Sequence, residues 1–205
     1  MVRSSGHISI LVCNEDQRGS WYFDGKRWVE DHRLARIPNV EDQEVLTASG
    51  GSDRGVRMRD VDVDGDCDLI VGNPRQQAIF EWNADQESWE RCGFSLPEST
   101  TIVSADGQDA GLRFVDLNED GRDDIVFSNE SYSSVSLFKS IEEGWVTLER
   151  SGDASSIPRI TRRGTNNGVW FANGYMWLQN EDTDRLPDGV DRRSFAELLE
   201  KPKAD

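Results

Sequence analysis

A run of acidic residues with regular spacing is the part of this sequence best suited to chemistry. Residues 60–68 read Asp-Val-Asp-Val-Asp-Gly-Asp-Cys-Asp, with a carboxylate at every odd position and a glycine at the sixth. Carboxylates this close repel one another by about 1 to 4 kcal/mol per pair, depending on the local dielectric, so the turn needs a neutralising cation. Ca²⁺ fits because it takes about six to eight oxygen ligands. The spacing therefore predicts a calcium site.

The ligands expected at this site follow from their positions in the loop. Side-chain oxygens are expected from Asp60, Asp62, Asp64 and Asp68, and a backbone carbonyl from Asp66. Gly65 allows the sharp bend. A second loop, residues 116–124, reads Asp-Leu-Asn-Glu-Asp-Gly-Arg-Asp-Asp and has Gly121 at the bend. Its expected ligands are the side chains of Asp116, Asn118, Asp120 and Asp124 and the backbone carbonyl of Arg122, so the chain is expected to hold two Ca²⁺ ions.

A calcium site fits the two loops better than a plain turn, an EF-hand or a catalytic centre does. A solvated Asp/Gly turn does not need an oxygen at every odd position. An EF-hand requires a bidentate Glu at its twelfth position, where these loops have Val71 and Phe127. Acid/base catalysis is disfavoured because a calcium-filled site leaves no carboxylate free.

No catalytic residue is expected elsewhere in the chain. The sequence has no Gly-x-Ser-x-Gly elbow, phosphate-binding loop or His-rich metal cluster. The two histidines, His7 and His32, are expected at the surface. We therefore expect a protein that is not an enzyme.

The loops are positioned by a sequence repeat of about 56 residues. Residues 51–60 recur as residues 107–116, and each copy continues through its acidic loop into a β-type segment, residues 69–73 or 125–129. An aromatic-containing strand follows, and each copy closes on a strand with a tryptophan, Trp89 or Trp145. This pattern predicts four short strands per copy.

The two ends of the chain contain incomplete copies. Residues 1–50 match the back half of a copy, and residues 164–182 begin another in which the pair Asn173-Gly174 predicts a two-residue type I′ hairpin in place of the acidic loop. A short helix is expected over residues 191–200, with Asp191 as its cap. The predicted domains are a partial blade (1–50), two blades with calcium loops (51–106 and 107–163), a partial blade without one (164–182) and a tail (183–205).

Repeated four-stranded units of this length are typical of β-propeller blades. The fold class is predicted to be all-β, with four-stranded antiparallel sheets, a short C-terminal helix and too few blades to close a ring. Either exposed edge strands or further blades of a larger ring are expected.

Composition limits the partners and the compartment. The chain has 39 acidic and 23 basic residues, a formal net charge of −16, which argues against nucleic acid and anionic lipid as partners. Its three cysteines have no metal-ligand spacing and are expected to be small buried residues. No signal peptide or membrane-spanning segment is visible in this chain. Loops suited to millimolar calcium conflict with an unsecreted protein, which suggests that the chain starts partway through a longer gene product.

Residues 60–73 and 116–129 resemble FG-GAP/VCBS repeats of integrin-α-like β-propellers. The resemblance implies that each Asp-x-Asp-x-Asp-Gly-x-x-Asp loop joins two strands of a blade and holds a structural Ca²⁺ in an extracellular or periplasmic protein. A weaker similarity, in residues 164–183 and 191–195, is to the junction in large planctomycete-type secreted proteins where a propeller precedes a sugar-dehydrogenase-like or cytochrome c-like module.

Three roles are expected from these observations. The first is a non-enzymatic scaffold or protein-interaction module, and the second is a lectin-like module whose tryptophans stack on a glycan. The third is an accessory module of a periplasmic enzyme. The tryptophans considered for sugar stacking are Trp28, Trp89, Trp145, Trp170 and Trp177, and a place in the blade core is favoured for them because three recur at one position of the repeat.

Overall fold

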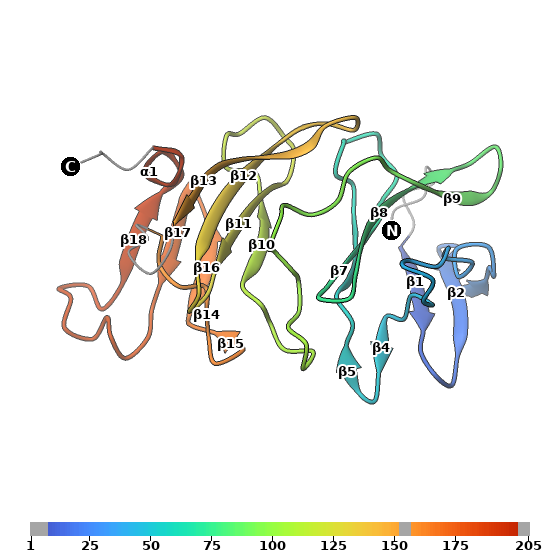
Figure 1. The fold of residues 1–205 in the computed structure, drawn as a ribbon, viewed down its shortest axis with the longest axis horizontal. Coiled ribbons are helices and arrows are strands. Elements are labelled where there is room, and N and C mark those ends of the chain that lie inside the picture. The colour runs from blue at the N-terminus through green and yellow to red at the C-terminus, as the bar shows by residue number, and fades with distance from the viewer. Residues whose placement is uncertain (1–7, 152–156, 201–205) are drawn as a thin grey trace. The chain divides into compact units, whose positions relative to one another are not determined.

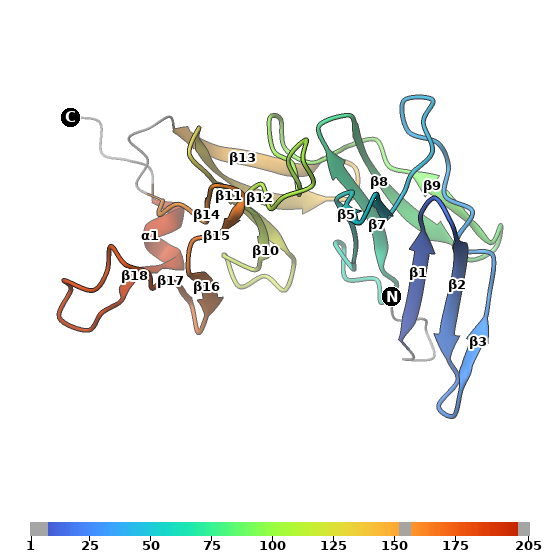
Figure 2. The same ribbon diagram turned by 90° about the horizontal axis from the view of Figure 1, so that it is seen from below.

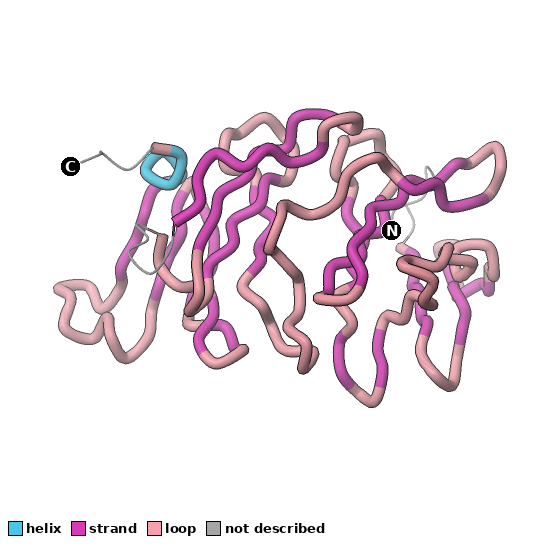
Figure 3. The backbone as a smooth tube through the Cα atoms, viewed as in Figure 1, coloured by secondary structure: helices cyan, strands magenta, loops and turns pink. Residues whose placement is uncertain are grey.

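The computed structural model describes residues 8–151 and 157–200. This part of the chain consists of strands joined by turns, and its one helix is α1 (Phe195–Leu199), drawn in cyan in Figure 3. The predicted all-β class and the short C-terminal helix are confirmed. Among the described residues, no helix is both long enough and apolar enough to cross a membrane.

The chain divides into two compact units. The first comprises Met1–Leu96, Val103–Gln108 and Ser140–Gly144, and the second comprises Pro97–Ile102, Asp109–Lys139 and Trp145–Asp205. Each unit contains two larger sheets and a short two-stranded hairpin.

The first unit contains a three-stranded and a four-stranded meander. The three-stranded sheet, whose strands lie side by side in Figure 2, has the order β1 (Ser9–Cys13), β2 (Arg18–Phe23), β3 (Trp28–Glu30). The four-stranded sheet has the order β6 (Val56–Arg59), β7 (Asp68–Asn73), β8 (Gln76–Asn83), β9 (Ser88–Arg91). The hairpin of β4 (Ala48–Ser49) and β5 (Ser52–Asp53) lies between them in the sequence.

Successive side chains of a strand point to opposite faces of its sheet. The apolar side chains on one face of each of these two sheets pack together in a shared core. Leu11 and Cys13 of β1 share a core with Leu69 and Val71 of β7. Trp89 of β9 is buried in the same core. Its indole N–H donates to the carbonyl of Leu34 at 2.8 Å, so the polar end of the ring is satisfied.

The second unit repeats this arrangement with its own core. Its four-stranded sheet has the order β10 (Leu112–Val115), β11 (Asp124–Ser128), β12 (Ser133–Ser140), β13 (Gly144–Ser151). Its three-stranded sheet has the order β16 (Val169–Ala172), β17 (Tyr175–Leu178), β18 (Asp191–Ser194), and it follows the hairpin of β14 (Thr161–Arg162) and β15 (Thr165–Asn166). Val126, Val135, Val169 and Met176 pack together with Leu198 of α1.

The predicted hairpin is present in the second unit. Ala172 pairs with Tyr175, and the two residues between them, Asn173 and Gly174, have φ of 53° and 76°. Positive φ at both central positions is the requirement of a type I′ turn, so this prediction is confirmed.

The predicted start of the helix is wrong. Residues 191–194 form β18, which pairs with β17 and is followed directly by α1 in Figure 1. Ser194, and not Asp191, caps the helix: its hydroxyl accepts from the amide of Glu197, whose side chain accepts from the Ser194 amide. Strand pairing with β17 therefore outweighs the local preference of Asp191 for a helix cap. As a result, β18, which lies in the predicted tail of residues 183–205, belongs to the sheet.

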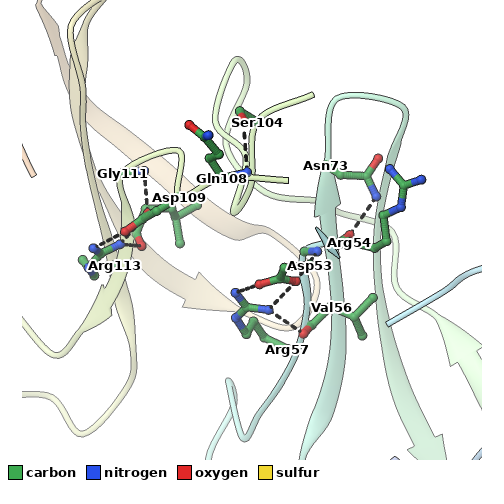
Figure 4. Close-up of polar contacts among 12 residues, drawn as sticks. Asp53, Arg54, Val56, Arg57, Asn73, Ser104, Gln108, Asp109, Gly111 and Arg113 are labelled. Carbon is green, nitrogen blue, oxygen red and sulfur yellow. Dashed lines mark hydrogen bonds and ion pairs between the residues drawn. The ribbon is translucent and has the colours of Figure 1, made fainter. Parts of the chain in front are cut away.

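Each four-stranded sheet begins with the same ion pair, shown in Figure 4. Arg57 donates to both carboxylate oxygens of Asp53, at 3.1 and 2.6 Å, and Arg113 donates to those of Asp109 at 2.9 and 2.6 Å. In both cases the Asp also accepts from the amide two residues later, in Gly55 or Gly111. These bonds hold the chain at the point where it enters the first strand of the sheet.

Candidate metal centre

Both acidic loops connect the first two strands of a four-stranded sheet. Residues 60–67 join β6 to β7, where Arg59 pairs with Asp68. Residues 116–123 join β10 to β11, where Val115 pairs with Asp124. The strand pairing brings the two ends of each loop together, so the last Asp of the motif lies at the start of the second strand.

The first loop is held by hydrogen bonds from its own backbone to its carboxylates. The two oxygens of Asp60 accept from the amides of Asp64 and Gly65, both at 3.1 Å. Asp62 also accepts from the Asp64 amide, at 3.3 Å, and Asp64 accepts from the Asp66 amide at 2.8 Å. These bonds turn the side chains of the odd positions towards the inside of the loop.

The second loop has the same set of bonds. The two oxygens of Asp116 accept from the amides of Asp120 and Gly121 at 3.0 and 2.9 Å. Asn118 accepts from the Asp120 amide at 3.1 Å, and Asp120 accepts from the Arg122 amide at 2.9 Å. The two loops therefore share one conformation although their sequences differ at several positions.

The ninth position closes each loop on its sheet. A carboxylate oxygen of Asp68 accepts from the Val61 amide at 2.9 Å, and one of Asp124 accepts from the Leu117 amide at 3.0 Å. Asp124 also accepts from the amide of Phe138 at 2.9 Å. Both carboxylates are buried, and these bonds tie the loop to the sheet.

Backbone conformation at the fourth position is a feature that sequence reasoning missed. Val63 and Glu119 occupy it with φ of 67° and 59°, in the left-handed region that a β-branched residue such as Val rarely adopts. The glycines at the sixth position, Gly65 and Gly121, have φ of 98° and 88°. A glycine in the sequence indicates that positive φ is possible at its position, whereas Val63 and Glu119 give no such indication.

Three of the predicted ligands meet in the first loop. Oxygen atoms of Asp60, Asp62 and Asp64 lie within 4.8 Å of one another. Asp66 and Asp68 are not members of that group, and Asp66 was expected to act through its carbonyl. In the second loop Asn118 takes the place of the middle carboxylate, so this loop contains one acidic group fewer at the same three positions.

Burial and mutual repulsion raise the pKa of several of these carboxylates. Burial raises the pKa of Asp68 to about 7 and that of Asp124 to about 6. Burial, followed by repulsion from Asp64, raises the pKa of Asp62 and of Asp66. A divalent cation would reverse these effects because it stabilises the charged form of every carboxylate around it.

Glu81 of β8 is an acidic neighbour of the first loop that sequence reasoning also missed. Burial raises its pKa, and the charges of Asp62 and Asp64 add to the effect. Its negative charge adds to the field that would attract a cation. The sequence shows only an isolated Glu in a strand, and the register of the β7–β8 hairpin is needed to place it near the loop.

The donor set of both loops suits a hard cation. The predicted ligands are carboxylate, carboxamide and carbonyl oxygens, which are the ligands of Ca²⁺ and Mg²⁺. Cys67, inside the first loop, and Cys92 are partly buried, and Cys13 is fully buried. Burial raises the pKa of Cys92 to about 12, so its thiol is protonated at neutral pH.

The tryptophans divide into buried and exposed positions. Trp89 and Trp145 are only 4% and 7% exposed, which confirms a place in the core for these two. Trp28 and Trp170 are 47% and 42% exposed, so the predicted place in the core is wrong for these two. Trp170 stacks on Trp177 with ring centroids 6.0 Å apart and an interplanar angle of 7°.

Comparison with known proteins gives a family match for part of the chain. No curated protein and no solved structure matches the chain. Residues 60–127, which contain both acidic loops and the whole of β7 to β10, match the family described as FG-GAP-like repeat. The match covers about a third of the chain, so it shows that this part, which carries both acidic loops, is similar to FG-GAP-like repeats.

Proposed function

We propose that this chain is a non-enzymatic calcium-binding scaffold or protein-interaction module with two structural Ca²⁺ sites, in the loops of residues 60–68 and 116–124. The observation that carries the proposal is the identical hydrogen-bond pattern of the two loops, which turns oxygen-bearing side chains inward at the same positions. Selection of one loop conformation in two different sequences is expected if both surround the same ion.

Calcium is favoured over magnesium by the shape of the ligand set. Each loop offers several oxygens from one short, curved segment, which suits the larger and more flexible coordination sphere of Ca²⁺. Mg²⁺ requires near-ideal octahedral geometry and keeps more of its water. The ion would link the first two strands of a blade, so its effect is on stability.

The expected size of that effect is modest. Extracellular modules bind Ca²⁺ with dissociation constants of about 10⁻⁴ to 10⁻³ M. At about 1 mM Ca²⁺ each site would then add roughly 0.4 to 1.4 kcal/mol to the free energy of unfolding by mass action. Sites of this strength would fill where calcium is millimolar, so the proposal includes an extracellular or periplasmic location for the protein.

Thermal unfolding with and without calcium tests the proposal. The unfolding midpoint should rise on adding millimolar CaCl₂ to EDTA-treated protein and should respond less to MgCl₂. A chain with Asp64→Ala and Asp120→Ala should lose this rise. A chain with Asp106→Ala and Asp188→Ala, two exposed positions outside the loops, removes the same charge and should keep it. A midpoint that does not respond to calcium would refute the proposal.

A lectin-like role is the second candidate, and it is favoured by the exposed stack of Trp170 on Trp177. The guanidinium of Arg192 also lies beside this pair, 5.9 Å from the centroid of the Trp177 ring. An aromatic face beside hydrogen-bond donors is suited to a sugar ring. Glycan-array binding that is lost in Trp170→Ala, with unchanged thermal stability, would support this role.

The sequence resemblance indicates which protein partner of the scaffold to test first. A dehydrogenase-like or cytochrome c-like module is the first partner to test, because residues 164–183 resemble the junction that precedes such modules. Nucleic acid is not proposed as a partner, since the net charge of −16 would repel it.

A further inference from the structure

Among the described residues, the three-stranded sheet of the first unit has no counterpart of the first strand of the other three large sheets. In those sheets the second strand (β7, β11 or β17) pairs on one side with a preceding strand (β6, β10 or β16). β1 corresponds to these second strands because it too leads into an asparagine, Asn14, that starts a tight turn. Among the described residues, β1 pairs only with β2.

The backbone groups on the outer edge of β1 are placed to pair with another strand. The amide and carbonyl of Cys13 point away from β2, since they bond to the hydroxyl and amide of Thr47 at 3.0 and 2.6 Å. Because this direction alternates along a strand, the amides and carbonyls of Ser9 and Leu11 point the same way. No described residue bonds to them. The corresponding residues of β7, Asp68 and Ile70, pair with β6.

Asn14 lacks a bond that its counterparts make. In the other three sheets the asparagine carboxamide donates to the backbone carbonyl just before the first strand: Asn73 to Arg54 at 3.0 Å, Asn129 to Ala110 at 3.1 Å and Asn180 to Asn167 at 3.0 Å. The carbonyl group of Asn14 accepts from the turn as the others do, but its NH₂ group has no acceptor among the described residues. This NH₂ group is therefore positioned to bind an incoming carbonyl.

Ser9 provides a third, independent sign of an absent strand. Its hydroxyl is buried and has no hydrogen-bond partner among the described residues. The residues at the same position of the complete sheets, Asp68 and Asp124, accept from an amide just beyond the first strand, that of Val61 or Leu117. A buried hydroxyl without a partner is costly, and a strand placed like β6 would bring it an amide.

Side-chain exposure also differs between β1 and the second strands of the two four-stranded sheets. Ile10 of β1 is 42% exposed, whereas Leu69 and Ile125, at the same position of β7 and β11, are fully buried. In the four-stranded sheet of the first unit, Met58 of β6 lies opposite Leu69. Leu69 is also buried in the core between the two sheets, so an added strand with an apolar residue at that position would cover part of the Ile10 side chain.

We propose that the outer edge of β1 binds an extended segment of a partner polypeptide, which adds antiparallel to β1 and completes the sheet. The segment has the character of β6 and its approach: a glycine, then apolar residues alternating with basic ones. The alternation places apolar side chains over Ile10, and the basic residues suit a chain with a net charge of −16. The strand contributes main-chain bonds to Ser9 and Leu11, a carbonyl to Asn14 and an amide to the Ser9 hydroxyl.

A peptide with the sequence of residues 53–61 is the probe for this edge, because it includes the residue whose amide would reach the Ser9 hydroxyl. Fluorescein-labelled peptide should bind the full chain saturably by fluorescence anisotropy, and hydrogen exchange should slow at the amides of Ser9 and Leu11. The amides of Ile10 and Val12 already pair with β2 and serve as internal controls. A peptide with proline in place of its Arg57 should not bind, because that residue supplies paired backbone groups in β6.

A matched variant of the chain distinguishes strand addition at β1 from unspecific peptide binding. Asn14→Asp keeps the oxygen that accepts from the amides of Asp16 and Gln17 but removes the NH₂ group, so it should weaken peptide binding roughly three- to tenfold without changing the thermal unfolding midpoint. Equal binding of the proline peptide, or unchanged exchange at Ser9 and Leu11, would overturn the proposal. Protection that instead grows with protein concentration alone would show that a second copy of the chain occupies the edge, and would overturn it too.

Discussion

Lowering the pH from 8 to 6 should weaken calcium binding at the loop of residues 60–68 about tenfold, because the proposed site includes Asp68 as a carboxylate ligand. In the metal-free chain burial raises the pKa of Asp68 to about 7. The fraction of Asp68 that carries a proton then changes from about one tenth at pH 8 to about nine tenths at pH 6. The same reasoning gives only about a twofold change for the loop of residues 116–124, because the pKa of Asp124 is raised to about 6.

Calorimetry in buffers of different ionisation enthalpy measures this linkage as protons released per ion bound. At pH 7 the first loop should release about half a proton and the second about a tenth. The two loops are separated by titrating chains that carry Asp120→Ala or Asp64→Ala, so that one loop binds at a time. In the first of these backgrounds, Asp68→Asn should remove the pH dependence. Equal affinity at pH 6 and pH 8 in the chain with Asp120→Ala would refute the assignment of Asp68 as a buried ligand.

Three further predictions concern stability. Without calcium, the thermal unfolding midpoint should fall as the pH rises from 5 to 8, because raised folded-state pKa values stabilise the fold only while these carboxyls are protonated, and calcium should reduce this fall. Gly111→Ala should cost more than about 2 kcal/mol in urea unfolding, since its Cβ would lie 2.4 Å from the Ser128 carbonyl oxygen at a φ of 99°. Gly50→Ala, with open space around it, should cost about half of that. Trp89→Phe should cost about 1 to 2 kcal/mol, because the indole bond to Leu34 is lost in the core.

Features that depend on neighbouring residues in the chain were predictable from the sequence. The Asn173-Gly174 turn needs positive φ at two adjacent positions, and these residue types supply it. The bends at Gly65 and Gly121 were predictable for the same reason. The four-stranded copies followed from the repeat, because each contains its own turn residues and strands.

Features that depend on distant strands were not predictable. Asp191 has the residue type of a helix cap, but it lies in β18 because its backbone pairs with β17. Trp28 and Trp89 occupy the same position of the repeat and differ from 47% to 4% in exposure, since only Trp89 has an adjoining sheet to cover it. The left-handed conformation of Val63 was not predictable for a different reason: hydrogen bonds within its own loop, around Asp60, oppose the backbone preference of a valine.

The number of calcium ions bound per chain tests the central claim most directly. Equilibrium dialysis followed by elemental analysis should give two ions for the unaltered protein and one for Asp64→Ala or Asp120→Ala alone. The double variant should bind none. An unaltered chain that binds no calcium, or variants that retain both ions, would contradict the account of the two loops as calcium sites.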